Sequence, residues 1–197
     1  RANNFKSQLR ENLSLYDTVY VVGKYAEEII QKQTHFDGNL QQLLYYIEDV
    51  KGDSIMPPEE IETSGKFRMV IAGVVSYRKG HDVLLECLDY ISQEYLNDME
   101  ILIAGVTDKS DIANKIEGGK FKNIKLLGGV SHEKLMRLMQ TMDILLCPSM
   151  DDPMPIVCTE AFMLAKPVIV GTNTGTAAFI KDGINGFVVE SGNKRLL

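Results

Sequence analysis

The residues with the clearest potential for chemistry are two carboxylates in the C-terminal third of the chain. Asp152 lies in an acidic, proline-rich loop at residues 150–155, and Glu160 follows within a run of helix-forming residues. If most of the intervening span is helical, the two carboxylates lie about 12 Å apart along the helix axis, at about 1.5 Å per residue. This separation is too long for an acid/base pair on one bond, and it suits two contacts on one extended ligand. The spacing is also compatible with a simpler interpretation, in which Asp152 caps the helix and Glu160 is solvated.

Two further segments have the composition of anion-binding loops. Gly175 and Thr176 precede a predicted helix, where free backbone N–H groups and the positive end of the helix dipole attract phosphate. Arg78, Lys79 and Gly80 follow an apolar predicted strand, and their two cations would also bind an anion. Taken alone, each segment is equally compatible with an ordinary glycine loop or a solvated basic turn.

The histidines and cysteines favour structural roles. His132 and His81 each begin a predicted helix, so we interpret both as exposed or capping residues rather than bases. Cys87, Cys147 and Cys158 are widely spaced in apolar or helical segments. Core thiols in a reducing compartment are therefore favoured over a disulfide or a metal site.

Several common motifs are absent from the sequence, and their absence excludes function classes. No G-x-G-x-x-G follows a strand, which disfavours a nicotinamide dinucleotide site, and no P-loop motif indicates an ATPase. No G-x-S-x-G elbow is present, which removes the usual hydrolase. Neither a His/Cys cluster with metal-ligand spacing nor a D-x-D triplet occurs, so we expect no metal and no resident cofactor.

The bulk composition limits the partners of the chain. The net charge of −6 argues against nucleic acid as a partner, because such proteins present a basic face. No apolar run approaches the roughly 18 residues of a membrane span. The chain begins with Arg1 rather than Met, and we expect it to be a piece of a longer protein.

The candidate residues lie in loops of an alternating pattern of strands and helices. The pattern predicts strands at residues 67–75, 100–104, 123–127, 144–147, 167–170 and 186–189, and helices at residues 81–95, 111–117, 134–139, 156–164 and 176–181. Because the strands are almost continuously apolar, the predicted fold class is α/β, a Rossmann-like parallel sheet with helices on both faces. The loops that follow such strands lie on one edge of the sheet, where ligands usually bind.

The N-terminal part of the chain has a different organisation. Residues 1–15 are predicted to form a helix or a disordered entry, followed by a strand at 16–22, a helix at 25–33 and a short strand at 43–47. Residues 48–66 are rich in Gly, Pro, Ser and acidic residues, and we interpret them as a linker.

Seven short motifs follow one another along residues 67–193. They are Lys79-Gly80, Leu127-Gly128-Gly129-Val130-Ser131, Pro148-Ser149, Asp152 with Glu160-Ala161, Ala165-Lys166-Pro167-Val168-Ile169, Thr174-Gly175 and Asp182-Gly183-Ile184-Asn185-Gly186. In this order they resemble the C-terminal, donor-binding half of retaining family 4 glycosyltransferases (glycosyl transferases group 1). Those enzymes have the GT-B architecture of two Rossmann-like domains.

The resemblance implies transfer of a sugar, with retention, from a nucleotide diphosphate sugar to a glycan or lipid-linked acceptor in polysaccharide or glycoconjugate synthesis. It implies no metal, and it names Asp152 and Lys79 as catalytic residues. In the implied arrangement, Lys79 and Arg78 contact the donor diphosphate, and Asp152 faces the transferred sugar. Glu160 binds the ribose, and the turn from Gly128 to Ser131 borders the base. Backbone N–H groups at Thr174, Gly175 and Thr176 cradle the phosphate.

The resemblance also implies a domain arrangement. Residues 1–47 correspond to the end of the N-terminal acceptor domain, 48–66 to the linker and 67–197 to a donor-binding domain that is truncated at its C-terminus. Such a fragment is expected to bind nucleotide or nucleotide sugar weakly and to transfer no sugar. The expected location is cytoplasmic, with peripheral association of the full-length protein at the inner face of a membrane left open.

The sequence departs from the family pattern in the acidic loop. The first family Glu is Asp152, one methylene shorter, and Pro153 and Pro155 replace glycines, which removes two N–H donors. These changes leave a second hypothesis open, a non-catalytic module that binds a sugar nucleotide or a protein partner. A flavodoxin-like or epimerase-like nucleotide fold would explain the strands, but not the combination of Lys79, Asp152 and Glu160.

Overall fold

The structure is a computed structural model that describes residues 2–43, 65–193 and 195. The chain divides into two compact units, Arg1–Ile47 and Glu48–Leu197. The predicted linker at residues 48–66 lies almost entirely outside the described residues.

The first unit contains two helices and two parallel strands. Its elements are α1 (Ala2–Leu13), β1 (Thr18–Val22), α2 (Gly23–Thr34) and β2 (Asn39–Leu43). The predicted first strand and the helix that follows it are confirmed. Of the strand predicted at residues 43–47, Leu43 is the last residue of β2, and residues 44–47 lie outside the described part of the chain. The start of β2 at Asn39 was not predicted. Most side chains of β2 are exposed, so its pairing with β1 depends on backbone groups and leaves no hydrophobic pattern in the sequence.

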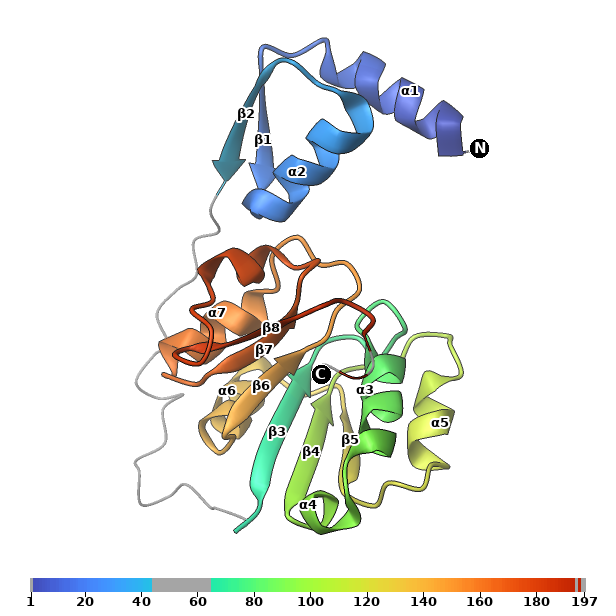
Figure 1. The fold of residues 1–197 in the computed structure, drawn as a ribbon, viewed down its shortest axis with the longest axis vertical. Coiled ribbons are helices and arrows are strands. Elements are labelled where there is room, and N and C mark those ends of the chain that lie inside the picture. Colours follow the sequence, from blue (N-terminus) through green and yellow to red (C-terminus); the bar gives the residue numbers. More distant parts are fainter. Residues whose placement is uncertain (1, 44–64, 194, 196–197) are drawn as a thin grey trace. The chain divides into compact units, whose positions relative to one another are not determined.

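The second unit is a six-stranded sheet with helices between the strands (Figure 1). Its strands are β3 (Phe67–Ala72), β4 (Met99–Ala104), β5 (Ile124–Gly128), β6 (Ile144–Cys147), β7 (Val168–Gly171) and β8 (Gly186–Val189). Its helical segments are α3 (His81–Cys87), η3 (Leu88–Tyr90), α4 (Gln93–Asn97), α5 (Ile112–Glu117), α6 (His132–Gln140), α7 (Ile156–Met163) and η4 (Gly175–Phe179). Every strand pairs in parallel with its neighbours, so the predicted fold class is confirmed.

The order of the strands creates a switch point in the middle of the sheet. The order is β5-β4-β3-β6-β7-β8, so the chain builds outward from β3 in one direction and then outward from β6 in the other. The loops that leave β3 and β6 therefore diverge, and a crevice at the carboxyl ends of these two strands is where ligands bind in such sheets.

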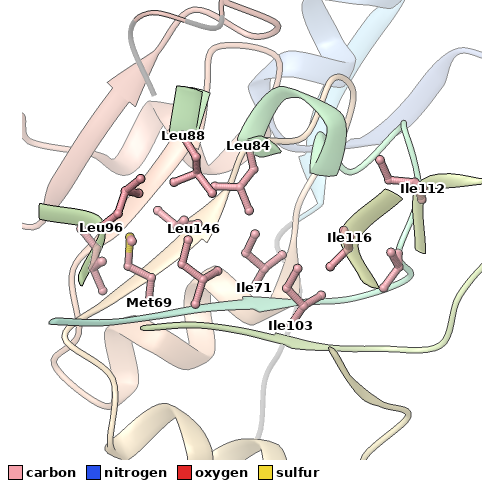
Figure 2. Packing of buried hydrophobic residues seen from close by; sticks show 12 residues of the cluster. Met69, Ile71, Leu84, Leu88, Leu96, Ile103, Ile112, Ile116 and Leu146 are labelled. Atoms are coloured by element: carbon pink, nitrogen blue, oxygen red, sulfur yellow. The ribbon is translucent and has the colours of Figure 1, made fainter. Parts of the chain in front are cut away.

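Successive side chains of each central strand enter separate cores on the two faces of the sheet. In β3, Met69 and Ile71 pack in one cluster with residues of α3 and α5 such as Leu84, as Figure 2 shows. Val70 packs in the other cluster, with residues of α6 and α7 such as Met136. Helices thus cover both faces, which explains why the strands are apolar at nearly every position.

The single helix predicted at residues 81–95 is wrong in its extent. The structure divides this segment into α3, η3 and α4. Ile91 adopts an extended conformation (φ −91°, ψ 134°) and packs against the first core cluster, and Ser92 is the extended N-cap of α4. The break allows the chain to turn back toward β4 while Ile91 stays partly buried, which periodicity alone does not reveal.

The three cysteines are free and buried, as expected of core thiols. Among the described residues, no helix is long and apolar enough to cross a membrane.

Candidate active site

Three loops meet at the carboxyl ends of β3, β6 and β7, and backbone hydrogen bonds hold them together. The N–H of Met150, in the loop after β6, donates to the carbonyl of Arg78, in the loop after β3, at 2.9 Å. The N–H of Asp152 donates to the carbonyl of Asn173, in the loop after β7, at 3.1 Å. The N–H of Gly175 returns a bond to the carbonyl of Asp152 at 3.0 Å. The acidic loop is therefore fixed on both sides.

Lys79 and Asp152 form an ion pair at the switch point of the sheet. The ammonium of Lys79 donates to Oδ2 of Asp152, and the two side chains are 18% and 10% exposed. The backbone N–H of Lys79 donates to the Ser76 hydroxyl at 3.3 Å, which fixes the start of the stem. An ammonium has three donors and a carboxylate has further lone pairs, so this pair retains capacity for both an anion and hydroxyl groups.

Gly80 allows the loops after β3 and β6 to approach closely. Its φ is +75°, and a Cβ at this position would lie 2.0 Å from the carbonyl oxygen of Pro148. A side chain would therefore push apart the two loops that carry Lys79 and Asp152. This contact explains why glycine follows Lys79.

Arg78 lies across the acidic loop. Its Nη1 donates to the carbonyl oxygen of Asp151 at 3.0 Å. The guanidinium thus neutralises part of the loop and supports the backbone next to Asp152. With five N–H donors, the side chain can keep this bond while it contacts an anion.

Glu160 is buried in α7 and faces the start of α6. Its Oε1 lies 2.7 Å from Nε2 of His132, whose side chain is 70% exposed, whereas that of Glu160 is 10% exposed. Glu160 is therefore not the solvated residue of the simpler interpretation. Asp152 is not a helix cap either, because the N-cap of α7 is Pro155 and no side chain caps it.

His132 is a residue that sequence reasoning placed correctly at the surface but did not connect to the site. Ser131 caps α6, accepting a hydrogen bond from the N–H of Lys134 at 3.2 Å. This cap places His132 at the first position of the helix, facing Glu160. The only available signal was its position between the glycine turn and the helix.

The loop after β7 differs from its prediction. The helix expected at residues 176–181 is a five-residue 3₁₀ segment, η4, so no α-helix dipole supports a phosphate there. Ile180 is extended and ends the segment, and a Cβ at Gly175 would lie 1.8 Å from the carbonyl oxygen of Pro153. Thr174 and Thr176 are buried, and the Thr174 hydroxyl donates to the carbonyl of Gly171 at 2.8 Å.

Gly128 and Ser131 lie beside a different part of the sheet. Gly128 ends β5, and its carbonyl accepts a hydrogen bond from the N–H of Gly105 at 2.8 Å. Because β4 separates β5 from β3, these two residues are not part of the Lys79 and Asp152 cluster. The His132 to Glu160 contact links their loop to α7.

His81 is buried, which corrects the expectation of an exposed or capping residue. Its side chain is fully buried below the loop after β3, with Nδ1 3.1 Å from the Ser76 carbonyl oxygen. Burial lowers the pKa of His81 below its ordinary value of 6.5, since an imidazolium there would lose its hydration.

We expect this lowered pKa to make folding pH-dependent. Below pH of about 6.5 the unfolded chain binds a proton that buried His81 does not, so stability falls as the pH falls, by up to about 1.4 kcal/mol per pH unit. His81→Asn should flatten the dependence of the unfolding free energy between pH 7.5 and 5, measured by urea titration. Exposed His35, which has a left-handed φ that Asn tolerates, gives the control His35→Asn. Equal slopes for His81→Asn and the unmodified chain would contradict the prediction.

Within residues 65–193 and the described part of the first unit, no group of three or more His, Cys, Asp or Glu side chains could hold a metal ion.

The fold and the switch-point cluster define a Rossmann-like domain of the kind that forms one half of GT-B glycosyltransferases. Residues 55–197 match the model of the family described as glycosyl transferases group 1. The chain therefore belongs to the glycosyl transferases group 1 family, as the motifs indicated.

Similar proteins come from several organisms. The chain is 28% identical over 123 residues to an uncharacterized glycosyltransferase of Methanocaldococcus jannaschii, an alignment that covers 61% of this chain and 31% of that protein. The crystal structure of HepE from Anabaena with UDP-glucose matches with a TM-score of 0.75 and 16% identity, over 94% of this chain and 55% of that one. Sucrose-phosphate synthase from Thermosynechococcus elongatus matches with a TM-score of 0.76 and 19% identity, over 95% of this chain and 48% of that one. The chain thus spans about a third of its archaeal relative and about half of each solved structure.

Proposed function

We propose that the protein transfers a sugar, with retention, from a nucleotide diphosphate sugar to a glycan or lipid-linked acceptor. The observation that carries this proposal is the partly buried ion pair between Lys79 and Asp152 at the switch point of the sheet. The pair places an ammonium that can bind a diphosphate beside a carboxylate that can accept hydrogen bonds from sugar hydroxyls. Family membership and the fold shared with HepE, a protein solved with UDP-glucose, support the assignment.

The ion pair suggests how this chain acts on a donor. One N–H of the Lys79 ammonium donates a hydrogen bond to a diphosphate oxygen. Arg78, which already supports the acidic loop, adds a second positive charge. As the bond between the sugar C1 and the diphosphate breaks, negative charge grows on the leaving group, and both cations stabilise it. The Asp152 carboxylate accepts hydrogen bonds from the sugar, which orients C1 toward the acceptor hydroxyl.

The remaining residues bind the nucleotide in this proposal. Glu160 accepts hydrogen bonds from the ribose hydroxyls, and the loop at Thr174, Gly175 and Thr176 borders the phosphate without the help of an α-helix dipole. The N–H groups of Thr174 and Gly175 already donate to the carbonyls of Gly171 and Asp152, so the backbone N–H of Thr176 is the phosphate donor in this proposal. The turn from Gly128 to Ser131 borders the base. Bound ribose would share the Glu160 carboxylate with His132, which holds one of its oxygens.

The domain arrangement in this proposal follows the GT-B pattern. Residues 1–47 end the acceptor domain, 48–66 form the linker and 67–197 bind the donor. The acceptor contacts belong to the part of GT-B enzymes that this chain does not span. We propose a cytoplasmic location, with a lipid-linked acceptor reached at the membrane surface.

A thermal-shift titration of this chain tests donor binding. UDP, GDP, ADP and dTDP sugars are added separately, and the true donor should raise Tm by about 5 to 10 °C at a concentration about 100 times Kd. Lys79→Ala should remove most of the shift. If none of the four raises Tm in a dose-dependent way, this chain is not a donor-binding domain.

Residues 1–197 alone are expected to bind the donor without transferring sugar. The reason is that the chain spans only about half of the matching GT-B structures, so acceptor contacts are missing. The amounts of free nucleotide diphosphate and of glycosylated acceptor are measured over several hours, with the full-length protein as the positive control. Robust transfer by this chain with its own donor and acceptor would refute the domain assignment.

Glu160→Gln should weaken nucleotide binding by about 10- to 100-fold, since a hydrogen bond to a charged group contributes about 1.5–3 kcal/mol. The loss should be confined to ligands with ribose hydroxyls, so the 2′,3′-dideoxy nucleotide should bind both forms equally in calorimetry. Glu133→Gln, an exposed acid in the first turn of α6, is the matched control. An equal loss for the dideoxy nucleotide would contradict a ribose contact.

A further inference from the structure

We propose that a second site, at the amino ends of the strands and opposite the candidate active site, binds a sugar phosphate. A cavity of about 490 Å³ lies there, within the ~300–1,000 Å³ typical of small-molecule sites. Its walls come from the segments that lead into β3, β4 and β5. The residues that line it are Lys66, Leu88, Asp89, Ile91, Gln93, Leu96, Asn97 and residues 120–123.

The topology separates this cavity from the candidate active site. Because all strands are parallel, the segments that enter β3, β4 and β5 lie at the edge opposite the loops that carry Lys79 and Asp152. In Figure 1, α4 marks this edge, at the start of β4. A ligand in the cavity would therefore be independent of a donor at the switch point.

The cavity is positively charged in a chain that is acidic overall. Lys66, Lys120 and Lys122 line it with Asp89 as the one acidic residue, an excess of two positive charges (three minus one) where the whole chain carries −6. The ammonium of Lys120 lies 2.6 Å from a carboxylate oxygen of Asp89 and 5.2 Å from the centre of the Phe121 ring. A cationic group is thus held beside an aromatic face at the wall of the cavity.

Asn123 supplies a hydrogen-bond donor that lacks an acceptor. Its Nδ2 is buried and has no hydrogen-bond partner among the described residues. Its carbonyl accepts a bond from the N–H of Ile101 at 2.8 Å, so the residue is fixed at the start of β5. A buried donor without an acceptor is costly, and rotation of the amide toward the cavity would let a ligand oxygen remove that cost.

The two kinds of surface together define the ligand. A phosphate monoester offers the negative charge and the acceptor oxygens that ammonium and amide groups bind. The apolar part of the wall is formed by Leu88 and Leu96, members of the core cluster in Figure 2, and by Phe121. These side chains suit the C–H face of a sugar ring, which an inorganic ion does not have.

Calorimetry on this chain at low ionic strength tests the proposal with ribose 5-phosphate, inorganic phosphate and ribose as probes. We expect saturable binding of ribose 5-phosphate, weaker binding of phosphate and none of ribose. Lys120→Gln with Lys122→Gln should weaken ribose 5-phosphate at least about tenfold, as expected for lost charge-assisted bonds. Lys24→Gln with Lys181→Gln changes the net charge equally at exposed positions elsewhere and should change affinity less than about twofold.

Two further variants decide where the probe binds. Asn123→Ala should also weaken ribose 5-phosphate, with an unchanged Tm of the free chain showing that the fold is intact. Lys79→Ala should leave the binding unchanged. The proposal is overturned if ribose 5-phosphate gives no saturable heat, if the two double variants lose affinity equally, or if Lys79→Ala removes the binding. None of these outcomes depends on sugar transfer.

Discussion

Asp152→Asn in the full-length protein is expected to lower the rate of sugar transfer by about 10²- to 10³-fold, the loss typical of removing one preorganised polar contact to a transition state. The substitution keeps the size of the side chain but removes the charge that pairs with Lys79. Nucleotide affinity should not fall, because the Lys79 ammonium then has one more N–H available to the diphosphate. The two effects are separated by measuring kcat for transfer and Kd for the nucleotide on the same preparations.

Asp151→Asn is the matched control for this experiment. Asp151 is the neighbouring residue with an exposed side chain, and its link to Arg78 is made by its backbone carbonyl, which the substitution keeps. Turnover of this variant should stay within about twofold of the parent. If Asp152→Asn also keeps full turnover, Asp152 has no catalytic role. A parent protein without any turnover but with nucleotide affinity would instead support the alternative of a non-catalytic binding module.

Gly175→Ala is expected to destabilise the second unit by about 2–4 kcal/mol, the range of severe steric substitutions. The new Cβ would lie 1.8 Å from the Pro153 carbonyl oxygen, which is backbone and cannot rotate away. The loops after β6 and β7 would have to separate, and the bond from the Gly175 N–H to the Asp152 carbonyl would be lost. Urea unfolding monitored by circular dichroism measures the change in stability.

Gly183→Ala separates this steric effect from the general cost of replacing glycine. Gly183 has φ +71° and nothing within 4 Å of an added Cβ, so only the left-handed backbone is penalised, by roughly 1–2 kcal/mol. The same comparison applies to nucleotide binding, which Gly175→Ala should weaken and Gly183→Ala should leave unchanged. If the two variants are equally stable, the loops can separate freely, and Asp152 is not held by the contact with Gly175.

The elements that the sequence predicted well are those buried on both sides. The strand at 144–147 is apolar at every position because its side chains enter both cores, and this pattern is visible without a structure. The N-cap at Ser131 was predictable because capping is local in sequence. In contrast, the start of β2 at Asn39 was missed because exposed side chains carry no pattern, and the break at Ile91 depends on packing against a core formed by distant residues.

The same distinction applies to the site. The order and spacing of the short motifs from Lys79-Gly80 to Asp182–Gly186 were enough to indicate the family, which the match of residues 55–197 confirms. Their contacts were not predictable, because Lys79 and Asp152 are 73 residues apart and meet only where the loops after β3 and β6 converge. His132 and Glu160 likewise meet across 28 residues.

The sequence by itself determined the α/β class, the family and the set of charged residues, since apolar runs and short motifs are properties of the linear chain. Only the tertiary structure decided that Asp152 pairs with Lys79, that Glu160 is buried against His132, that His81 is buried, and that a cationic cavity lies at the far edge of the sheet. The physical reason is that burial and charge pairing depend on which segments a parallel sheet brings together, and crossover connections bring together segments that are distant in the chain.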